Sequence, residues 1–339
     1  MPGIEAFHNL WMVQTRKVGI NISKNYVIEI GGRKLALSNL DKVFWPGEGY
    51  TKADLIAYYV EVAPYLLPHL HNRPLVFTRY PHGIEAKSFY QKNAPANRPG
   101  WVPTFAWYSE ESERTINFIL AEEAATLAWA ANLACLEIHP WLSTAPRPAY
   151  PDFVVFDLDP SPGSTYQDVR DIAAFLHQML DELKLRSYPK TSGGEGLHIY
   201  VPLQSRYTYQ EIRDFAQQVA GLAAAALPRI ATVERMVNKR GSRVYVDYLQ
   251  NGLGKTLSSP YSVRPRPGAP VSTPLEWSEV EQVVPEDFHL KNILPRLNER
   301  GDLFAPVLNH RQPLEGALHI LSEITCRLRA PEKNRWLPT

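Results

Sequence analysis

The amino-acid sequence predicts an α+β protein, built as one large domain or as two closely packed ones. Its 339 residues are 45% hydrophobic and 21% charged, which is ordinary for a protein with a sizeable core. Short runs of β-branched and aromatic residues recur along the chain and predict strands. Segments with apolar residues at helical spacing lie between them and predict helices. Prolines and glycines cluster between these segments, as they do in loops.

The expected elements alternate along the chain. A hairpin at 26–37 turns at Gly31 and Gly32, and the first helix begins at Thr51, an N-cap residue with Asp54 at the capping-box position. The further predicted strands share an apolar, strand-forming composition and lie at 74–81, 115–120, 137–142, 153–159, 197–203 and 242–251. The predicted helices are amphipathic or apolar and lie at 51–66, 123–136, 166–183, 208–227 and 314–328.

Charge and cysteine content exclude several classes of protein. The net charge is +1, so no overall basic field attracts nucleic acid, and any site for a polyanion must be a local patch. Cys135 and Cys326 are far apart and form no CxxC, which excludes a zinc finger and a disulfide framework and suits a reducing cytoplasm. The sequence has no signal peptide and no apolar run of membrane-spanning length, so we expect a cytoplasmic protein.

Two aspartates at the end of a strand point to metal chemistry. Asp157 and Asp159 end the apolar run "FVVFDLD", and residues two apart on a strand face the same way. Two carboxylates that close repel each other unless a positive group lies between them. Asp247 adds a third carboxylate within "VYVDYL". Three hard oxygen ligands on two strands are the minimum for a Mg²⁺ or Mn²⁺ site of the phosphoryl-transfer type. The simpler alternative is that these aspartates are turn residues or caps.

A glycine-rich stretch, "KTSGGEGLHIY" at 190–200, is a candidate anion site. Glycines let backbone N–H groups approach an anion closely. The Ser192 hydroxyl and a ring N–H of His198 can donate hydrogen bonds to phosphate oxygens. The stretch is not a P-loop, because no GK[ST] follows and the next element is a strand. A tight turn and a hydrogen-bonded core histidine are the simpler alternatives.

In this order, the D-x-D strand end, the S-G-G-x-G-x-H stretch and the later strand aspartate resemble the three motifs of the archaeo-eukaryotic primase superfamily. Within it, the chain is similar to the polymerase domain of bacterial ligase D, an end-joining repair enzyme. The same resemblance is carried by "LSNLDKVFWPGEGYTKADLIAYY", "FTRYPHG", "SFYQK", "EIHPW", "VFDLDPSPG", "KTSGGEGLHIYVPL", "VYVDYLQN" and "SPYSVRPRPGAPVSTPLEW". It covers about residues 35 to 308.

The resemblance implies a primase-like fold, with two subdomains of mixed and antiparallel sheets flanked by helices around one cleft. We expect the aspartates and the glycine-rich stretch on a sheet flanked by the helices at 166–184 and 209–226. The expected domains are an N-terminal extension at 1–25, a primase-polymerase domain at 26–308 whose catalytic part is about 115–265, and a helical tail at 309–339. Because no ligase or nuclease domain follows, a stand-alone polymerase is expected.

The resemblance also implies the activity and its cofactors. Two Mg²⁺ or Mn²⁺ ions would be held by Asp157, Asp159 and Asp247, with Asp247 on the catalytic ion. The reaction would add an NTP or dNTP to a DNA 3′-hydroxyl during non-homologous end joining, and members of the family often favour ribonucleotides. The implied partners are DNA ends with a recessed 5′-phosphate, a separate ATP-dependent DNA ligase and Ku, in a nucleoid-associated protein without a membrane role.

Three groups of binding residues follow from the resemblance. The residues implied in nucleotide binding are His139, Ser192, Gly193, Gly194, His198, Arg264 and Arg266. The residues implied in binding the 5′-phosphate of a DNA break are Asn39, Lys42 and Lys52. The residues implied in template or primer contact are Arg79, Phe89, Tyr90, Arg240 and Gln250. The simpler alternatives are that Phe89 and Tyr90 are core aromatics and that Lys42 and Lys52 are solvated surface charges.

The sequence departs from the family pattern at two positions. Glu195 stands where many relatives carry a basic residue facing the nucleotide, so we expect it either to point away or to pair with a nearby base. The aromatic pair is Phe89-Tyr90, where the family often has two phenylalanines. Two other functional classes stay open: a haloacid-dehalogenase-type phosphatase that uses the D-x-D motif, and a non-catalytic module that binds DNA ends.

Overall fold

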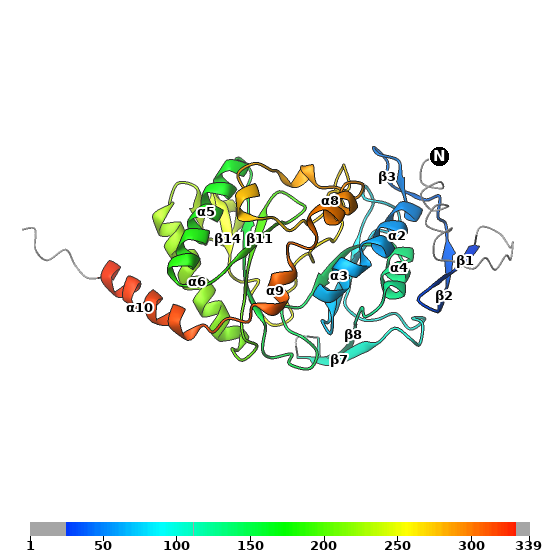
Figure 1. Ribbon diagram of the computed structural model, residues 1–339, viewed down its shortest axis with the longest axis horizontal. Helices are drawn as coiled ribbons and strands as arrows, with labels where there is room; N and C mark the ends of the chain where they lie inside the picture. The colour runs from blue at the N-terminus through cyan, green and yellow to red at the C-terminus, as the bar shows by residue number, and fades with distance from the viewer. Residues whose placement is uncertain (1–24, 111, 330–339) are drawn as a thin grey trace, which may run out of the picture.

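Two five-stranded sheets lie next to each other along the long axis of the molecule, each with its own helices (Figure 1). This computed structural model describes residues 25–110 and 112–329, so the predicted N-terminal extension falls almost entirely outside the described residues. The mixed sheets and flanking helices confirm the expected α+β fold.

The first half of the chain forms a helical layer and the sheet made of β5 to β9. Its strands are β1 (Asn25–Ile30), β2 (Arg33–Ser38), β3 (Val43–Trp45), β4 (Tyr50–Thr51), β5 (Leu75–Arg79), β6 (Phe89–Gln91), β7 (Thr104–Ser109), β8 (Arg114–Ile119) and β9 (Cys135–Pro140). Its helices are α2 (Lys52–Glu61), α3 (Ala63–Leu70) and α4 (Ala124–Asn132). The order in the sheet is β6-β5-β8-β7, and β9 also pairs with β5.

The second half contains the sheet that carries the aspartates. Its strands are β10 (Phe153–Asp159), β11 (Tyr188–Thr191), β12 (Leu197–Pro202), β13 (Ala231–Thr232) and β14 (Val244–Asp247). Its helices are α5 (Tyr166–Glu182), α6 (Tyr209–Ala226) and α7 (Val237–Arg240). The strand order is β11-β12-β10-β14-β13, antiparallel except between β13 and β14. The helices α5 and α6 pack on this sheet as expected, and β10 is its central strand.

The C-terminal part is mostly irregular and returns across both halves before it ends in a helix. Its elements are the 3₁₀ turns η1 (Trp277–Glu279) and η2 (Pro285–Asp287) and the helices α8 (Ile293–Arg300), α9 (Ala305–Asn309) and α10 (Glu315–Arg329). The predicted tail helix is therefore present. Its first turns pack on the domain, because Leu314, Ala317 and Leu321 are buried and the Leu314 N–H donates to the hydroxyl of Tyr207.

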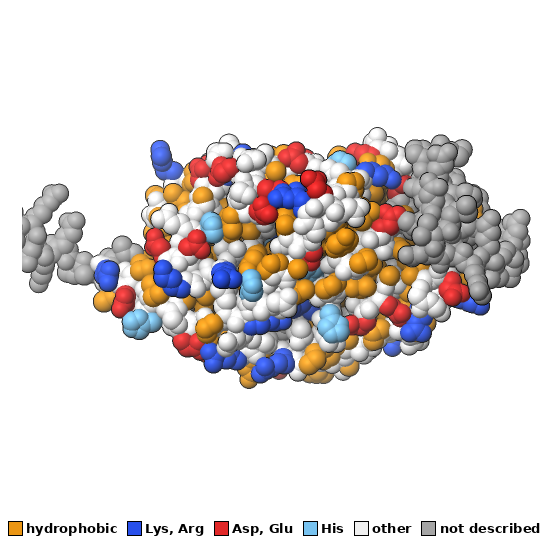
Figure 2. All heavy atoms as spheres, viewed as in Figure 1, with side chains coloured by type: hydrophobic (Ala, Val, Ile, Leu, Met, Phe, Trp, Pro, Cys, Tyr) orange, Lys and Arg blue, Asp and Glu red, His pale blue; other side chains and the backbone are white. Residues whose placement is uncertain are grey.

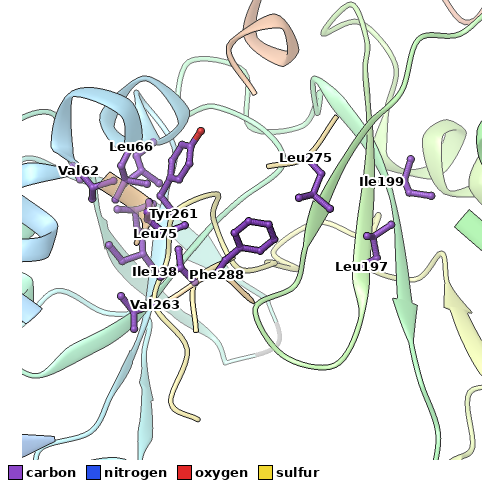
Figure 3. Packing of buried hydrophobic residues seen from close by; sticks show 14 of the residues in the cluster. Val62, Leu66, Leu75, Ile138, Leu197, Ile199, Tyr261, Val263, Leu275 and Phe288 are labelled. Atoms are coloured by element: carbon purple, nitrogen blue, oxygen red, sulfur yellow. The ribbon is translucent and has the colours of Figure 1, made fainter. Parts of the chain in front are cut away.

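One continuous hydrophobic core joins the two halves. Figure 3 shows Leu75 and Ile138 from the first sheet at one end of this cluster, and Leu197 and Ile199 from β12 at the other. Phe288 of the C-terminal part lies between them. The same cluster contains residues of both sheets, so the two halves pack against each other through this core. The candidate site lies between them.

The surface carries charges of both signs. Figure 2 shows acidic and basic side chains interspersed over the face in view, in keeping with the net charge of +1. Within the described part of the chain, no helix combines the length and the apolar character needed to cross a membrane.

Local sequence signals account for where the main helices begin. Thr51 caps α2, and its side chain and that of Asp54 form the expected reciprocal capping box. Capping boxes of the same kind begin α5 at Thr165 and α6 at Thr208. The hairpin of β1 and β2 turns at its two glycines, which have positive φ, as predicted.

Several predicted elements differ in extent. The helix expected at 123–136 ends at Asn132, and Cys135 and Leu136 begin the strand expected at 137–142. The helix expected at 51–66 is two helices, because Pro64 lacks an N–H and sits in the first turn of α3, so a new helix begins after Val62. The strand expected at 242–251 ends at Asp247. There the Asp247 carboxylate accepts a hydrogen bond from the Leu249 N–H, an Asx turn that replaces further pairing.

Candidate active site

Three carboxylates meet on one face of the second sheet. In the central strand β10, Asp157 lies directly opposite Asp247 of β14 and opposite His198 of β12. Asp159, two residues further along β10, points to the same face. Residues directly opposite each other in an antiparallel pair have Cβ atoms about 4.5–5.5 Å apart. The sheet register therefore brings together the three aspartates that the sequence analysis singled out.

Each of the three carboxylates is in a setting that disfavours an isolated negative charge. Burial raises the pKa of Asp157 to about 6, although Lys190 and Arg264 oppose this rise. The pKa of Asp247 is raised by burial and then by the charge of Asp157. Burial also raises the pKa of Asp159, and the charge of Asp157 adds to it. A cation between the carboxylates would relieve this electrostatic cost.

The donor set fits a hard divalent ion, since carboxylate oxygens are the ligands that Mg²⁺ and Mn²⁺ prefer. In the described residues, however, no three acidic, histidine or cysteine side chains are gathered in metal-holding geometry. Each carboxylate is instead directed at a protein donor. Asp159 accepts from Arg240 Nη1 at 2.9 Å, and Asp247 accepts from Gln250 Nε2 at 3.1 Å. Binding ions would require these side chains to turn toward one another.

The glycine-rich stretch forms a tight loop between β11 and β12, shaped by its own serine. The Ser192 hydroxyl oxygen accepts from the N–H groups of Gly194 at 3.0 Å and Gly196 at 3.1 Å. Gly196 packs so closely on β10 that a Cβ there would lie 2.1 Å from the carbonyl oxygen of Leu158. A Cβ on Gly193, which has a φ of +71°, would lie 2.7 Å from Arg264. The loop therefore needs glycine at both positions.

Two buried histidines face the space between the sheets. His139 on β9 has its Nε2 atom 3.0 Å from Thr78 Oγ1, and its pKa is lowered to about 3, chiefly by burial and then by Arg264. Burial and then the charge of Lys190 hold the pKa of His198 well below its usual range. Both rings are therefore neutral near pH 7, and each can offer one N–H donor.

The two predicted arginines are each paired with an acid. Arg264 Nε lies 2.8 Å from Glu137 Oε1, and an Nη1 hydrogen of Arg264 is donated to the carbonyl of Ser192 at 3.0 Å. Arg266 Nη1 donates to Glu195 Oε1 at 2.7 Å. Glu195 therefore pairs with a nearby base, which is one of the two outcomes expected for this departure from the family pattern.

Residues from both sheets line a pocket of about 240 Å³. The predicted residues that line it are Tyr90, His139, Asp157, Asp159, Ser192, Gly194, Glu195, His198, Arg264 and Arg266. The sequence motifs, separated by more than 170 residues along the chain, thus converge on one space. Gly193 and Asp247 lie beside this pocket rather than in its lining.

Lys190 and Glu137 were missed by the sequence analysis, although both belong to stretches that it quoted. Lys190 is fully buried, with Nζ 2.9 Å from Nδ1 of His198, and Glu137 is buried beside Arg264. Within a sequence, an isolated lysine or glutamate looks like a surface charge. The available signal was their place among strand-forming residues, in "YPKT" and "CLEIHP".

The residues expected to bind a 5′-phosphate form a separate cluster on the other half of the molecule. The pairing of β3 with β4 brings Lys42 next to Lys52, whose N–H donates to the Lys42 carbonyl at 2.8 Å. Lys52 is only 5% exposed, and its Nζ donates to the Ser38 carbonyl at 2.6 Å. Burial and then the charges of Lys42 and Arg79 lower its pKa to about 8. The alternative that Lys52 is a solvated surface charge is therefore wrong.

The aromatic pair lies on the surface. Phe89 and Tyr90, on the edge strand β6, are 45% and 71% exposed, so the alternative that they are core aromatics is wrong. The guanidinium of Arg79 lies 5.1 Å from the centre of the Phe89 ring. Tyr90 lies next to His139, with ring centres 6.4 Å apart. The pair therefore stands at the rim of the pocket, near the lysine cluster on one side and the histidine on the other.

Comparison with known proteins places this arrangement in a family. The family model for the LigD primase-polymerase domain matches residues 51–304. A bifunctional non-homologous end joining protein LigD of Bacillus subtilis is 36% identical over 294 residues, which are 86% of this chain and 47% of that protein. A multifunctional LigD of Mycolicibacterium smegmatis is 34% identical over 278 residues, 81% of this chain and 36% of that protein.

A solved structure agrees with the same assignment. The polymerase domain of Mycobacterium tuberculosis ligase D, in complex with DNA, superposes with a TM-score of 0.76 at 28% identity. The match covers 82% of this chain and 99% of that domain. The chain thus spans less than half of the length of its full-length relatives but nearly the whole of this domain. It belongs to the LigD primase-polymerase domain family.

Proposed function

We propose that this chain is a nucleotidyltransferase that adds nucleotides to a DNA 3′-hydroxyl at double-strand breaks, with residues 26–308 as its primase-polymerase domain and 309–339 as a helical tail. The observation that carries the proposal is the shared pocket. Carboxylates for metal ions lie on one wall, and a glycine loop, neutral histidine donors and arginines lie around them. Such a site suits phosphoryl transfer, in which positioning and charge neutralisation supply most of the rate enhancement.

Two divalent ions, Mg²⁺ or Mn²⁺, would be held by Asp157, Asp159 and Asp247. When bound, they would neutralise charge on the phosphates and help align the attacking and leaving oxygens. Asp159 must first be released from Arg240, and Asp247 from Gln250, for their oxygens to face the ions. We propose that these two donors then bind the primer terminus, which restores their hydrogen bonds.

The incoming triphosphate would be bound by groups of the glycine loop and of the C-terminal part of the chain. Gly193 offers a backbone N–H group, Ser192 its hydroxyl hydrogen and His198 a ring N–H. Gly194 keeps the loop in shape, because its own N–H is donated to Ser192 Oγ. Arg264 and Arg266 offer guanidinium groups that can bind phosphate oxygens in pairs. Because each arginine is also paired with a glutamate, part of its positive charge is offset before the nucleotide arrives. His139 would lie near the sugar of the incoming nucleotide. We propose that the enzyme prefers ribonucleotides.

The lysine cluster supports a second part of the proposal, which concerns the DNA end. Lys52 sits in the first turn of α2, where the partial positive charge of the helix end favours an anion. The backbone N–H groups of this turn are donated to protein acceptors, so the lysine side chains would supply the contacts to the anion. Lys42 lies alongside it, and Asn39 precedes both in the same turn of chain. We propose that they bind the 5′-phosphate of a gapped or broken duplex, while Phe89 and Tyr90 stack on template bases and Arg79 supports them.

The sequence similarity to end-joining proteins supports a role in non-homologous end joining. A separate ATP-dependent ligase and Ku are the proposed partners in that role. The haloacid-dehalogenase-type alternative leaves the glycine loop and the lysine cluster without a role, which counts against it. A non-catalytic DNA-end binder would differ from the proposed enzyme in one measurable property, because it would not extend a DNA primer.

The test is primer extension on a gapped duplex carrying a downstream 5′-phosphate, in Mg²⁺ and in Mn²⁺, with NTPs and dNTPs compared. The wild type should extend the primer only with metal. The Asp157→Ala, Asp159→Ala and Asp247→Ala variants should lose about 10²–10³-fold in rate, comparable with the loss of a preorganised electrostatic group. Their affinity for the DNA end should persist. Absence of extension by the wild type under all these conditions would favour the non-catalytic alternative.

A further inference from the structure

We propose that Lys190 is a positioning residue that holds the His198 ring in a single tautomer, with the hydrogen on Nε2. The ring then presents a fixed N–H donor on the Asp157 side of the candidate nucleotide pocket, which both residues line. The effect on nucleotide binding rests on the proposed function, but the tautomer itself can be measured without any polymerase reaction.

The contact between the two residues is built into the sheet. Lys190 of β11 lies directly opposite His198 of β12, and the two side chains point to the same side. Lys190 is fully buried, and His198 is 3% exposed. The Lys190 Nζ atom lies 2.9 Å from His198 Nδ1 and 2.5 Å from Ser272 Oγ. Buried N–H groups need protein partners, and these two atoms are the partners of the amine.

The direction of each hydrogen bond follows from what the groups can donate. The Ser272 hydroxyl has one hydrogen, which it donates to the Thr191 carbonyl at 2.8 Å, so its oxygen accepts from Lys190. A second N–H of the amine then points at Nδ1 of His198. A charged amine has no lone pair and can only donate, so Nδ1 must accept from it. A neutral amine still has two N–H bonds for the same two contacts, and the Asp157 contact on the other edge of the ring then selects the same direction. Nδ1 is thereby an acceptor, and the ring hydrogen lies on Nε2.

The opposite edge of the ring selects the same tautomer. His198 Nε2 lies 3.3 Å from Asp157 Oδ1, and an ionised carboxylate can only accept. A hydrogen on Nε2 makes this contact attractive, whereas a hydrogen on Nδ1 would set two lone pairs against each other. Contacts on both sides of the imidazole therefore agree, and the Lys190 contact is the shorter of the two.

The consequence concerns the donor that the pocket offers to a ligand. His198 lines the pocket, whereas Lys190 stands behind it and is absent from the lining. Lys190 therefore acts on a ligand through His198. Without the amine, Nδ1 would be buried with no donor, and the ring would be free to move its hydrogen to that side and lose the donor at Nε2. This loss would weaken the hold on an anionic ligand.

The experiment compares Lys190→Met, which keeps a long side chain but removes the amine, with Ser272→Ala as a matched control. Ser272→Ala removes the other partner of the same amine and leaves the Lys190–His198 contact. The tautomer would be read from long-range ¹H–¹⁵N NMR spectra of the full chain, with the His198 signals assigned by their loss in His198→Asn. Binding of a non-hydrolysable nucleoside triphosphate would be measured by calorimetry.

We expect the hydrogen on Nε2 in the wild type and in Ser272→Ala. In Lys190→Met this single tautomer should be lost, and the dissociation constant should rise about tenfold, as when one hydrogen bond to a charged group is removed. A hydrogen on Nδ1 in the wild type overturns the proposal, and this measurement suffices if Lys190→Met fails to fold. A folded Lys190→Met variant with unchanged His198 signals and affinity overturns it as well. An Nε2 hydrogen in a wild type that binds no nucleotide upholds the tautomer and counts against the proposed function.

Discussion

Glu195 Oε1 lies 2.7 Å from Nη1 of Arg266, so the acid in the glycine loop neutralises one of the two arginines that face the pocket. Both side chains are roughly half exposed, so this pair adds little to stability. Its effect falls on the field that an incoming anion meets. A triphosphate must either displace Glu195 from Arg266 or bind beside a cation whose charge is already offset.

Exchanging Glu195 for Lys should therefore lower the KM for the nucleotide, because a repulsive carboxylate is replaced by a cation. A favourable contact of this kind contributes about 1 kcal/mol, which is roughly a fivefold change. Glu195→Gln frees Arg266 without adding a charge, so its KM should fall by a smaller factor. Steady-state extension kinetics at fixed salt would measure both, and an unchanged or raised KM in Glu195→Lys would mean that this residue does not face the triphosphate.

Replacement of Lys42 and Lys52 together by Ala should erase any preference for a downstream 5′-phosphate. A terminal phosphate carries more charge than an internal phosphodiester, so a paired lysine site should distinguish the two. Binding to gapped duplexes with and without the 5′-phosphate would be measured over a range of salt. The slope of log K against log salt should flatten by roughly one to two counterions.

The matched control for this variant replaces two exposed lysines far from the cluster in sequence, Lys184 and Lys239, by Ala. It should keep the preference for the phosphorylated end. If the Lys42/Lys52 double variant still discriminates, the end-binding site lies elsewhere on the protein.

The pH dependence of stability should reveal the burial of Lys52. Its pKa of about 8 in the folded protein is below the value near 10.5 of an exposed lysine, so the unfolded chain binds more protons between these values. Below pH 8, the cost of burying the charged Lys52 lowers the free energy of unfolding in full. As the pH rises from 8 to 10.5, this cost is removed and the free energy of unfolding should increase.

Urea unfolding of the wild type and Lys52→Met between pH 7 and pH 10 would measure this contribution. The variant has no amine to titrate at this position. The free energy of unfolding of the wild type should therefore rise relative to that of the variant as the pH rises. The affinity for a 5′-phosphate should change in the opposite sense and fall above pH 8, because the neutral amine no longer attracts the anion. A pH-independent difference in stability would show that Lys52 titrates like an exposed lysine.

Gly196→Ala should destabilise the fold by several kcal/mol, because the new Cβ would lie 2.1 Å from the backbone oxygen of Leu158 in the central strand. Gly221→Ala is the control, since this glycine is within α6 and nothing lies within 4 Å of a Cβ there. That change should stabilise by about 0.5–1 kcal/mol through helix propensity. Denaturant unfolding of both variants measures the contrast, and equal effects would contradict the close packing of the loop on β10.

Phe89→Ala and Tyr90→Ala should weaken binding of templated DNA while leaving thermal stability near that of the wild type, because both side chains are largely exposed. Stacking of a base on an aromatic ring contributes about 1–3 kcal/mol. Tyr90→Phe keeps the ring and should behave like the wild type. Loss of stability without loss of DNA affinity would assign these rings to packing instead.

The sequence alone predicted the features that depend on neighbouring residues. The capping box at Thr51, the hairpin at Gly31 and the strand that ends in Asp159 are all set by side chains within a few residues of one another. Local backbone preference acts over the same short range, which is why these elements appear where the sequence predicts them. Through the family resemblance that they carry, the motifs and their order also pointed to most of the residues that line the pocket, but not to its wall at 256–258.

Partners remote in sequence were decided by the tertiary structure alone. Arg264 meets Glu137, Arg240 meets Asp159, and Lys190 is buried against a strand eight residues away and a serine 82 residues away. No local pattern encodes such pairs, because a charged side chain has the same intrinsic preference whether it ends in water or beneath a sheet. Its burial, its partner and its pKa arise only when the sheet register and the returning C-terminal segment exclude water from it and leave one group within reach.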